Sequence, residues 1–209
     1  MTTPPVRKNF LWFILAVNLM ALPALIYFTN QKITIHAAGA PNAAGLLPGY
    51  GQVAAFSLLD QNKNNVSLED LRGKVWIADF IFTNCPNQCP MMSQKMGLLQ
   101  QALPSGAQLV SISVDPERDT PDMLLNYAKT FNAKENKWFF LTGDKERVNS
   151  VLKSFHVNNA DDPNLHSLRF ALVDQKGEIR GYYDSMDPEA TKKLAADTNL
   201  LLRTNKNGQ

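Results

Sequence analysis

A nearly uninterrupted apolar run at residues 74–82, Lys-Val-Trp-Ile-Ala-Asp-Phe-Ile-Phe, limits the folds open to this chain. A strand without alternation of apolar and polar residues is typical of a sheet that is covered on both faces. Hydrophobic residues make up 44% of the 209 residues and charged residues 19%, which indicates a chain that folds around a core. We therefore expect one α/β domain built on this central strand.

Strand and helix patterns alternate on either side of the run. Further strands are expected at 53–59, 108–114 and 138–141, and helices at 90–103, 120–131 and 144–155. A hairpin is expected at 169–174 and 179–183 around a Gln-Lys-Gly turn, and a final helix at 187–202. This order of elements resembles the thioredoxin-like layout.

The first fifty residues differ from the rest in composition. Residues 1–8 form a short polar tail, and residues 9–29 form an uncharged, mostly apolar stretch. Its central nineteen residues, 10–28, would span about 28 Å as a helix, close to the ~30 Å hydrocarbon core of a bilayer. We expect a transmembrane anchor at 9–29 and an Ala/Gly/Pro/Asn-rich linker at 30–51, followed by the thioredoxin-like domain at 52–205.

Charges around the apolar stretch predict its orientation. Arg7 and Lys8 precede it, whereas Lys32 alone follows closely, so the positive-inside rule places the N-terminus in the cytoplasm. The protein would cross the inner (cytoplasmic) membrane once, with its domain on the periplasmic or extracytoplasmic side, where conditions are oxidising. The stretch is longer than a signal-peptide core, but small residues at 37–40 leave cleavage open.

The only two cysteines, Cys85 and Cys89, directly follow the central run at the mouth of the expected helix 90–103. A helix N-terminus favours thiolate over thiol. A thiolate is both the nucleophile of disulfide exchange and a soft ligand for copper(I). A purely structural bridge over four positions would stabilise little. The formal charge of +2, without a basic run interleaved with aromatics, excludes nucleic acid as a partner.

Three motifs occur in order within residues 52–184. They are Phe82-Thr83-Asn84-Cys85-Pro86-Asn87-Gln88-Cys89-Pro90, Ser113-Val114-Asp115-Pro116-Glu117-Arg118-Asp119-Thr120-Pro121, and His166-Ser167 ahead of Leu172-Val173-Asp174-Gln175-Lys176-Gly177. Together they resemble the Sco/SenC family, membrane-anchored copper proteins of thioredoxin-like fold that help assemble cytochrome c oxidase. Asn87 departs from the family pattern, which often has Asp there.

This resemblance implies that Cys85, Cys89 and His166 bind one copper ion, which passes to the copper-site subunit of cytochrome c oxidase. Oxidation of the thiols would block loading, so a thiol reductant protein is implied as a second partner. From the residues alone, His166 is favoured because it follows a polar loop able to lie over the site. His156 ends an expected helix, where an imidazole interacts favourably with the C-terminus.

Asp79 interrupts the apolar run six residues before Cys85. A buried acid needs a partner or a task, and thioredoxin-like oxidoreductases carry one at a similar offset that relays protons. This favours a second hypothesis, a membrane-tethered thiol–disulfide reductase acting on cysteines of an oxidase subunit. Against it, three residues separate the cysteines, where oxidoreductases of this fold usually have two. A thiol peroxidase is a weaker alternative, and a metallochaperone is favoured over an enzyme.

Other polar and soft side chains surround the cysteines in sequence. Asp115 and Asp119 follow a strand at the expected carboxyl edge of the sheet, where they could orient a ligand or cap a turn and a helix. Met91, Met92 and Met96 offer soft thioether sulfur, but their helical spacing favours a place in the core.

Overall fold

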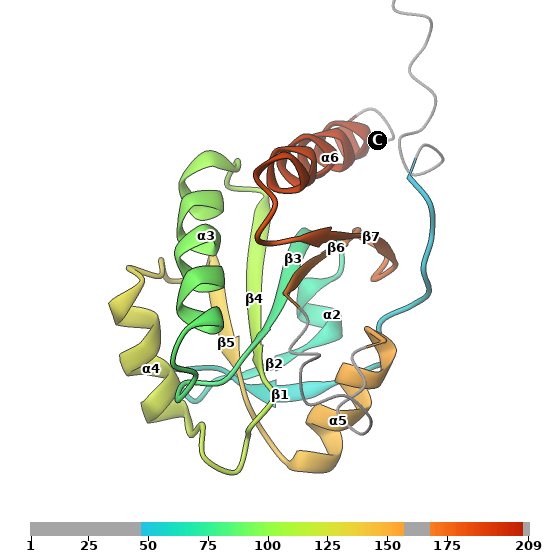
Figure 1. Ribbon diagram of the computed structural model, residues 1–209. Coiled ribbons are helices and arrows are strands. Elements are labelled where there is room, and N and C mark those ends of the chain that lie inside the picture. Colours follow the sequence, from blue (N-terminus) through green and yellow to red (C-terminus); the bar gives the residue numbers. More distant parts are fainter. Residues whose placement is uncertain (1–46, 157–167, 207–209) are drawn as a thin grey trace, which may run out of the picture. The chain divides into compact units, whose positions relative to one another are not determined.

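The computed structural model describes residues 47–156 and 168–206 (Figure 1). The expected tail, the anchor at 9–29 and most of the linker lie outside these residues. Within the two described ranges, no helix is both long enough and apolar enough to cross a membrane.

A five-stranded sheet forms the centre of the domain, in the order β5-β4-β3-β6-β7. Its strands are β3 (Val75–Ile81), β4 (Ala107–Ser113), β5 (Trp138–Leu141), β6 (Arg169–Val173) and β7 (Ile179–Asp184). The strand β3 pairs in parallel with β4 and antiparallel with β6. All of its residues are buried, which confirms the expectation of a central strand covered on both faces.

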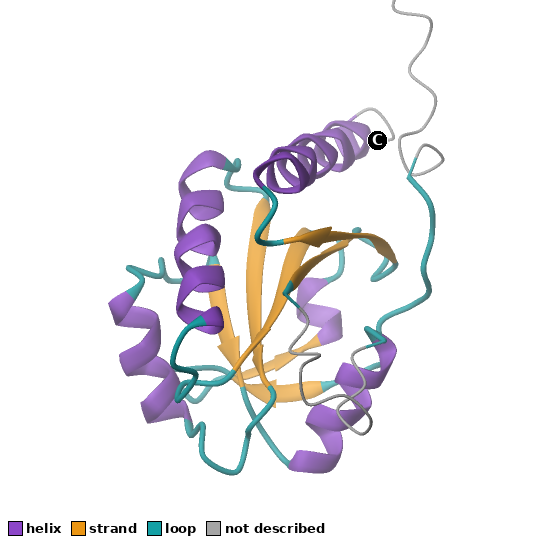
Figure 2. Cartoon of the chain, viewed as in Figure 1, coloured by secondary structure: helices purple, strands orange, loops and turns teal. Residues whose placement is uncertain are grey.

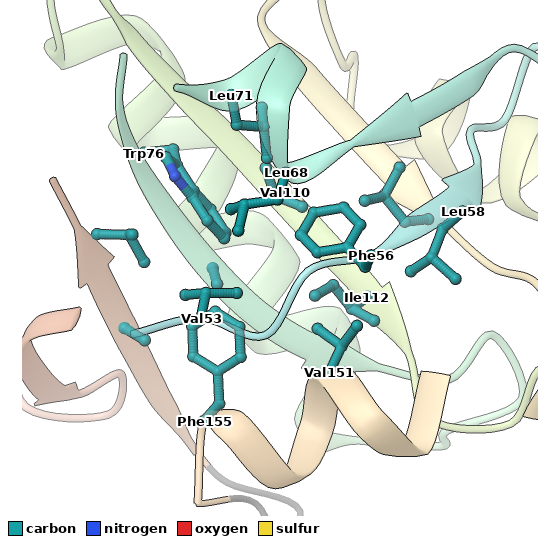
Figure 3. Close-up of a cluster of buried hydrophobic side chains, with 14 of the residues drawn as sticks. Val53, Phe56, Leu58, Leu68, Leu71, Trp76, Val110, Ile112, Val151 and Phe155 are labelled. Carbon is teal, nitrogen blue, oxygen red and sulfur yellow. The ribbon is translucent and has the colours of Figure 1, made fainter. Parts of the chain in front are cut away.

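Helices cover both faces of the sheet (Figure 2). They are α2 (Leu68–Leu71), α3 (Gln88–Ala102), α4 (Pro121–Thr130), α5 (Lys145–Ser154) and α6 (Pro188–Lys206). One apolar cluster joins the sheet to α3, α4 and α6. The other joins its opposite face to α2 and α5, and Figure 3 shows Phe155 and Val151 directed toward Trp76, Val110 and Ile112. The predicted α/β class is therefore confirmed.

A small hairpin contacts the open edge of β5 through its connecting turn. Its strands, β1 (Ser57–Leu59) and β2 (Asn65–Ser67), pair antiparallel with each other. In the connecting turn, Gln61 accepts a hydrogen bond from the Phe140 N–H at 2.8 Å and donates one to the Trp138 carbonyl at 3.4 Å. The side-chain amide thus pairs with edge-strand backbone groups that would otherwise remain open.

Phe155, at the end of α5, packs against the sheet in the cluster that contains α2 and α5. Its replacement tests how much this packing stabilises the fold. Its side chain is 1% exposed and meets the rings of Trp76 and Phe80 edge-on, at centroid distances of 5.9 and 5.2 Å. Phe155→Ala should lower the free energy of unfolding by about 3–5 kcal/mol, because it leaves a cavity among these rings. Urea unfolding followed by tryptophan fluorescence measures this loss.

The exposed Leu98 provides the control, since Leu98→Ala should change the same free energy by no more than about 0.5 kcal/mol. Equal effects of the two substitutions would show that α5 does not stabilise the sheet as described.

Candidate functional site

The two cysteines lie in contact where β3 gives way to α3. Cys85 is half-buried in the connecting loop, where its N–H donates to the Phe82 carbonyl at 3.2 Å. Cys89 is 1% exposed, and its N–H donates to the Cys85 sulfur at 3.3 Å. No disulfide joins the two residues. Two sulfur-bearing side chains are therefore held at one turn of the chain.

The Cys85 sulfur occupies the place of a helix cap. The helix α3 begins at Gln88, two residues earlier than expected, so Cys89 lies inside its first turn and not beside its cap. Asn87 precedes the helix without making a side-chain capping bond. The N–H of Cys89 is one of the donors that a helix leaves unpaired at its start, and the sulfur accepts from it.

The two thiols have opposite acid–base character. Partial burial by itself would raise the pKa of Cys85, but hydrogen bonds from Cys89 and from the N–H groups of residues 87 and 88 outweigh it, so this pKa is lowered. Burial raises the pKa of Cys89 to about 12. At neutral pH, Cys85 is thus the residue disposed to form a thiolate, while Cys89 keeps its proton.

Asp119 ties the cysteine loop to the sheet. Its carboxylate is 1% exposed and accepts from the Thr83 hydroxyl at 2.5 Å and from the Thr83 N–H at 3.1 and 3.2 Å. It also accepts from the Ser113 hydroxyl at 2.6 Å, at the end of β4. The Asp115 N–H donates to that same hydroxyl, but the Asp115 carboxylate faces Arg118 at 3.4 Å. Of the two acids, Asp119 contacts the loop directly.

Asp79 is fully buried on the central strand. The Ser111 hydroxyl donates to its Oδ1 at 2.5 Å and accepts from the Trp138 indole N–H at 2.9 Å. Its Oδ2 has no hydrogen-bond partner within the described part of the chain. Burial raises the pKa of Asp79 to about 7, although the bond from Ser111 acts in the opposite sense.

Asp79 lies close enough to the thiols to influence them. A charge on its carboxylate raises the pKa of Cys89 and of Tyr127. The Tyr127 hydroxyl lies 3.0 Å from that of Ser93, on the first half of α3. Ser93 lies one helix turn after Cys89 on α3, whereas Tyr127 belongs to no recognisable motif and only the folded arrangement brings it to this region.

The structure describes only one of the three histidines, His156. His36 and the predicted ligand His166 lie outside the described residues. His156 is exposed just after α5, with its Nε2 3.4 Å from the Tyr50 carbonyl oxygen. Among the residues that the structure describes, no group of three or more His, Cys, Asp or Glu side chains is arranged to hold a metal.

Of the three methionines that follow the cysteines on α3, two are buried and one is exposed. Met92 and Met96 are buried and pack in the same apolar cluster as Cys89, as their spacing predicts. Met91 is 49% exposed on the first turn of α3, so the core prediction was wrong for this residue.

Comparison with known proteins places the chain in a family. The family model described as SCO1/SenC matches residues 48–202. The SCO1 protein homolog of Bacillus subtilis is 37% identical over 155 residues, which cover 70% of this chain and 80% of that protein.

Solved structures agree. BsSco, described as a member of the Sco family of cytochrome c oxidase assembly proteins with a disulfide switch, is 32% identical over 74% of this chain and 95% of its own, at a TM-score of 0.64. Bradyrhizobium japonicum ScoI with copper bound is 26% identical over 72% and 99%, at a TM-score of 0.61. The thioredoxin-like fold is thereby confirmed, and the chain belongs to the SCO1/SenC family.

Proposed function

We propose that this chain is a membrane-anchored copper chaperone that assists copper insertion into cytochrome c oxidase. It binds one copper ion through Cys85, Cys89 and His166. The observation that carries the proposal is the contact between the Cys89 N–H and the Cys85 sulfur, which holds two soft ligands at one helix turn. Membership of the SCO1/SenC family and the copper bound in the related ScoI support it.

The acid–base character of the pair suits stepwise loading. Cys85, with its lowered pKa, offers the first thiolate to copper(I). Cys89 gives up its proton only when the metal competes for its sulfur, because burial raises its pKa. Loading therefore releases protons, and transfer to a target proceeds by exchange of ligands.

The chain direction supports His166 as the third ligand. The strand β6 runs antiparallel to β3, with Ala171 opposite Ala78, so β6 starts at the end of the sheet where β3 ends. Leu168, the first described residue before β6, packs against the cluster that contains both cysteines. His166 is two residues away, a chain span of at most about 7 Å.

The position of His156 argues against it as a ligand. Its ring faces the Tyr50 carbonyl. The N–H of Tyr50 donates to Ile179, at the start of β7. Since β7 runs antiparallel to β6, this is the end of the sheet away from the thiols.

The remaining parts of the proposal come from the sequence. The uncharged stretch 9–29 anchors the chain in the inner membrane, and the charges around it place the domain on the periplasmic side. The target is the copper-site subunit of the oxidase, and a thiol reductant protein keeps Cys85 and Cys89 reduced.

His166→Ala tests the ligand set, with His156→Ala as the matched control. Under anaerobic, reducing conditions the unaltered chain and His156→Ala should each bind one copper(I) ion. His166→Ala should bind it at least ~10-fold more weakly, since one of three ligands is lost. Competition with a chromogenic copper(I) chelator gives the affinities. If His166→Ala and the unaltered chain compete equally well, the three-ligand site is wrong.

Asp119→Asn tests whether the cysteine loop is held in place for copper. The amide loses acceptor capacity toward Thr83 and Ser113, at a cost of about 1–3 kcal/mol. We expect lower copper(I) affinity with the domain still folded by circular dichroism. The control is Asp122→Asn, an exposed acid paired with Lys63, which should leave affinity unchanged. Equal affinities of the two variants would remove Asp119 from the site.

Asp79 favours a second function, reduction of disulfides on an oxidase subunit. In such a step the Cys85 thiolate attacks the substrate disulfide and displaces one thiolate. Cys89 passes its proton to Asp79, attacks Cys85 and releases the second thiolate, so two electrons leave the pair as its own disulfide forms. The pKa of about 7 for Asp79 suits it to accept this proton. The disulfide switch described for BsSco agrees with a redox-active pair.

Asp79→Asn separates the two functions. Between pH about 4 and 7 the buried carboxyl holds a proton that the unfolded chain releases, so stability falls as pH rises. Removing the acid should flatten this fall and stabilise the protein at pH 8 by up to about 4 kcal/mol. Chemical unfolding across pH measures this. Loss of turnover with a disulfide substrate, but not of copper affinity, is expected for the reductase; unchanged turnover would rule out the relay.

A further inference from the structure

The helix α3 presents to solvent a stripe that is apolar apart from one lysine. Met91, Lys95, Leu98 and Ala102 follow the spacing of one helix face. Leu98 is 65% exposed, more than any other large apolar side chain in the described residues, and Met91 is 49% exposed. Large contiguous apolar patches on a protein surface are typical of sites that bind another molecule.

Leu98 stands as a ridge between two hollows. One, of about 330 Å³, lies between α3 and α6 and is lined by Leu98, Leu99 and Ala102 together with Pro188, Thr191 and Ala195. The other, of about 350 Å³, lies between α3 and the end of α4, and Gly97 and Phe131 line it together with the polar side chains of Gln94, Gln101, Thr130 and Asn132. Figure 2 shows α3 flanked by these two helices. A ridge with a hollow on each side can interlock with an apolar surface of complementary shape.

The two charged side chains that line the first hollow, Lys95 and Lys192, are both positive. Lys95, the single charged residue of α3, lines the first hollow, and its Nζ donates to the Ser185 carbonyl. Lys192 borders the same hollow and pairs with Glu189 at 2.7 Å, but both side chains are more than 70% exposed. A pair this exposed is weak, so Lys192 remains able to meet another carboxylate. A partner for this face carries apolar side chains bordered by acids.

The stripe is continuous with the thiol site. It begins at Met91, two residues after Cys89, and Leu98 lies about 10 Å further along the helix axis. A protein seated on the stripe therefore also covers the first turn of α3. The exposed thioether of Met91 would lie at that junction, where it offers soft sulfur to copper during exchange.

We propose that the α3 face, defined as Met91, Lys95, Leu98, Ala102 and the two hollows beside Leu98, is the docking surface for the copper-accepting oxidase subunit. That subunit binds through an apolar surface bordered by carboxylates. The inference rests on the proposed function for the identity of its partner. Its placement rests on the exposure, shape and charge of the face itself.

The test uses the full-length chain in detergent and the soluble copper-site domain of the oxidase subunit from the same organism. Calorimetric titration gives the dissociation constant, first without copper and then with one copper(I) per chain. Leu98→Glu should weaken binding at least ~10-fold, because it places a charge at the centre of the contact and opposes the partner's acids. Lys192→Glu should weaken binding and reduce its salt dependence.

Met123→Glu is the matched control. Met123 is 47% exposed on α4 and lines neither hollow, so this variant should bind as the unaltered chain does. Equal dissociation constants for Leu98→Glu and Met123→Glu would overturn the docking surface, while copper transfer by the unaltered chain would leave the proposed function standing. Failure of the unaltered chain to bind the domain in either state would overturn both the target and the surface. Binding without copper uptake would refute only the chaperone role.

Discussion

The hydrogen bond from the Cys89 N–H to the Cys85 sulfur is the contact on which the site depends. A helix start leaves N–H groups without partners, and here a sulfur accepts one of them. The bond fixes the spacing of the two side chains and also distinguishes them, because it stabilises a thiolate at Cys85 while burial keeps Cys89 protonated. One local interaction therefore gives the pair both a shared geometry and an order of deprotonation. Either copper uptake or disulfide exchange can use that order.

The surrounding fold holds this contact in place from two sides. The fully buried strand β3 leads directly into the cysteine loop. It also carries Asp79, whose charge raises the pKa of Cys89. Beside it, Asp119 joins Thr83 in the loop to Ser113 at the end of the neighbouring strand. These buried hydrogen bonds hold the cysteine loop to the sheet, so the loop has little freedom left to lose when a metal binds. Within the described residues, Met91 and Leu98 on the outer face of α3 are exposed to solvent.

The sequence predicted the parts of the fold that have a strong periodic signal and missed those that depend on single contacts. The run at 74–82 predicted β3 because both faces are apolar, and the helices after it were placed to within a few residues. The short β2 and α2 were not predicted, since three or four residues carry no measurable period. The start of α3 was misplaced because a sulfur cap has no sequence signature.

The sequence likewise predicted only part of the candidate site. The motifs identified Cys85, Cys89 and Asp119, whereas Tyr127 approaches the cysteines only through tertiary packing. Helical spacing could not separate the buried Met92 from the exposed Met91.

X-ray absorption at the copper edge of the copper(I)-loaded chain tests the central claim most directly. The account predicts two sulfur neighbours and one imidazole nitrogen around each copper; a single sulfur, or two sulfurs with no nitrogen, would contradict it.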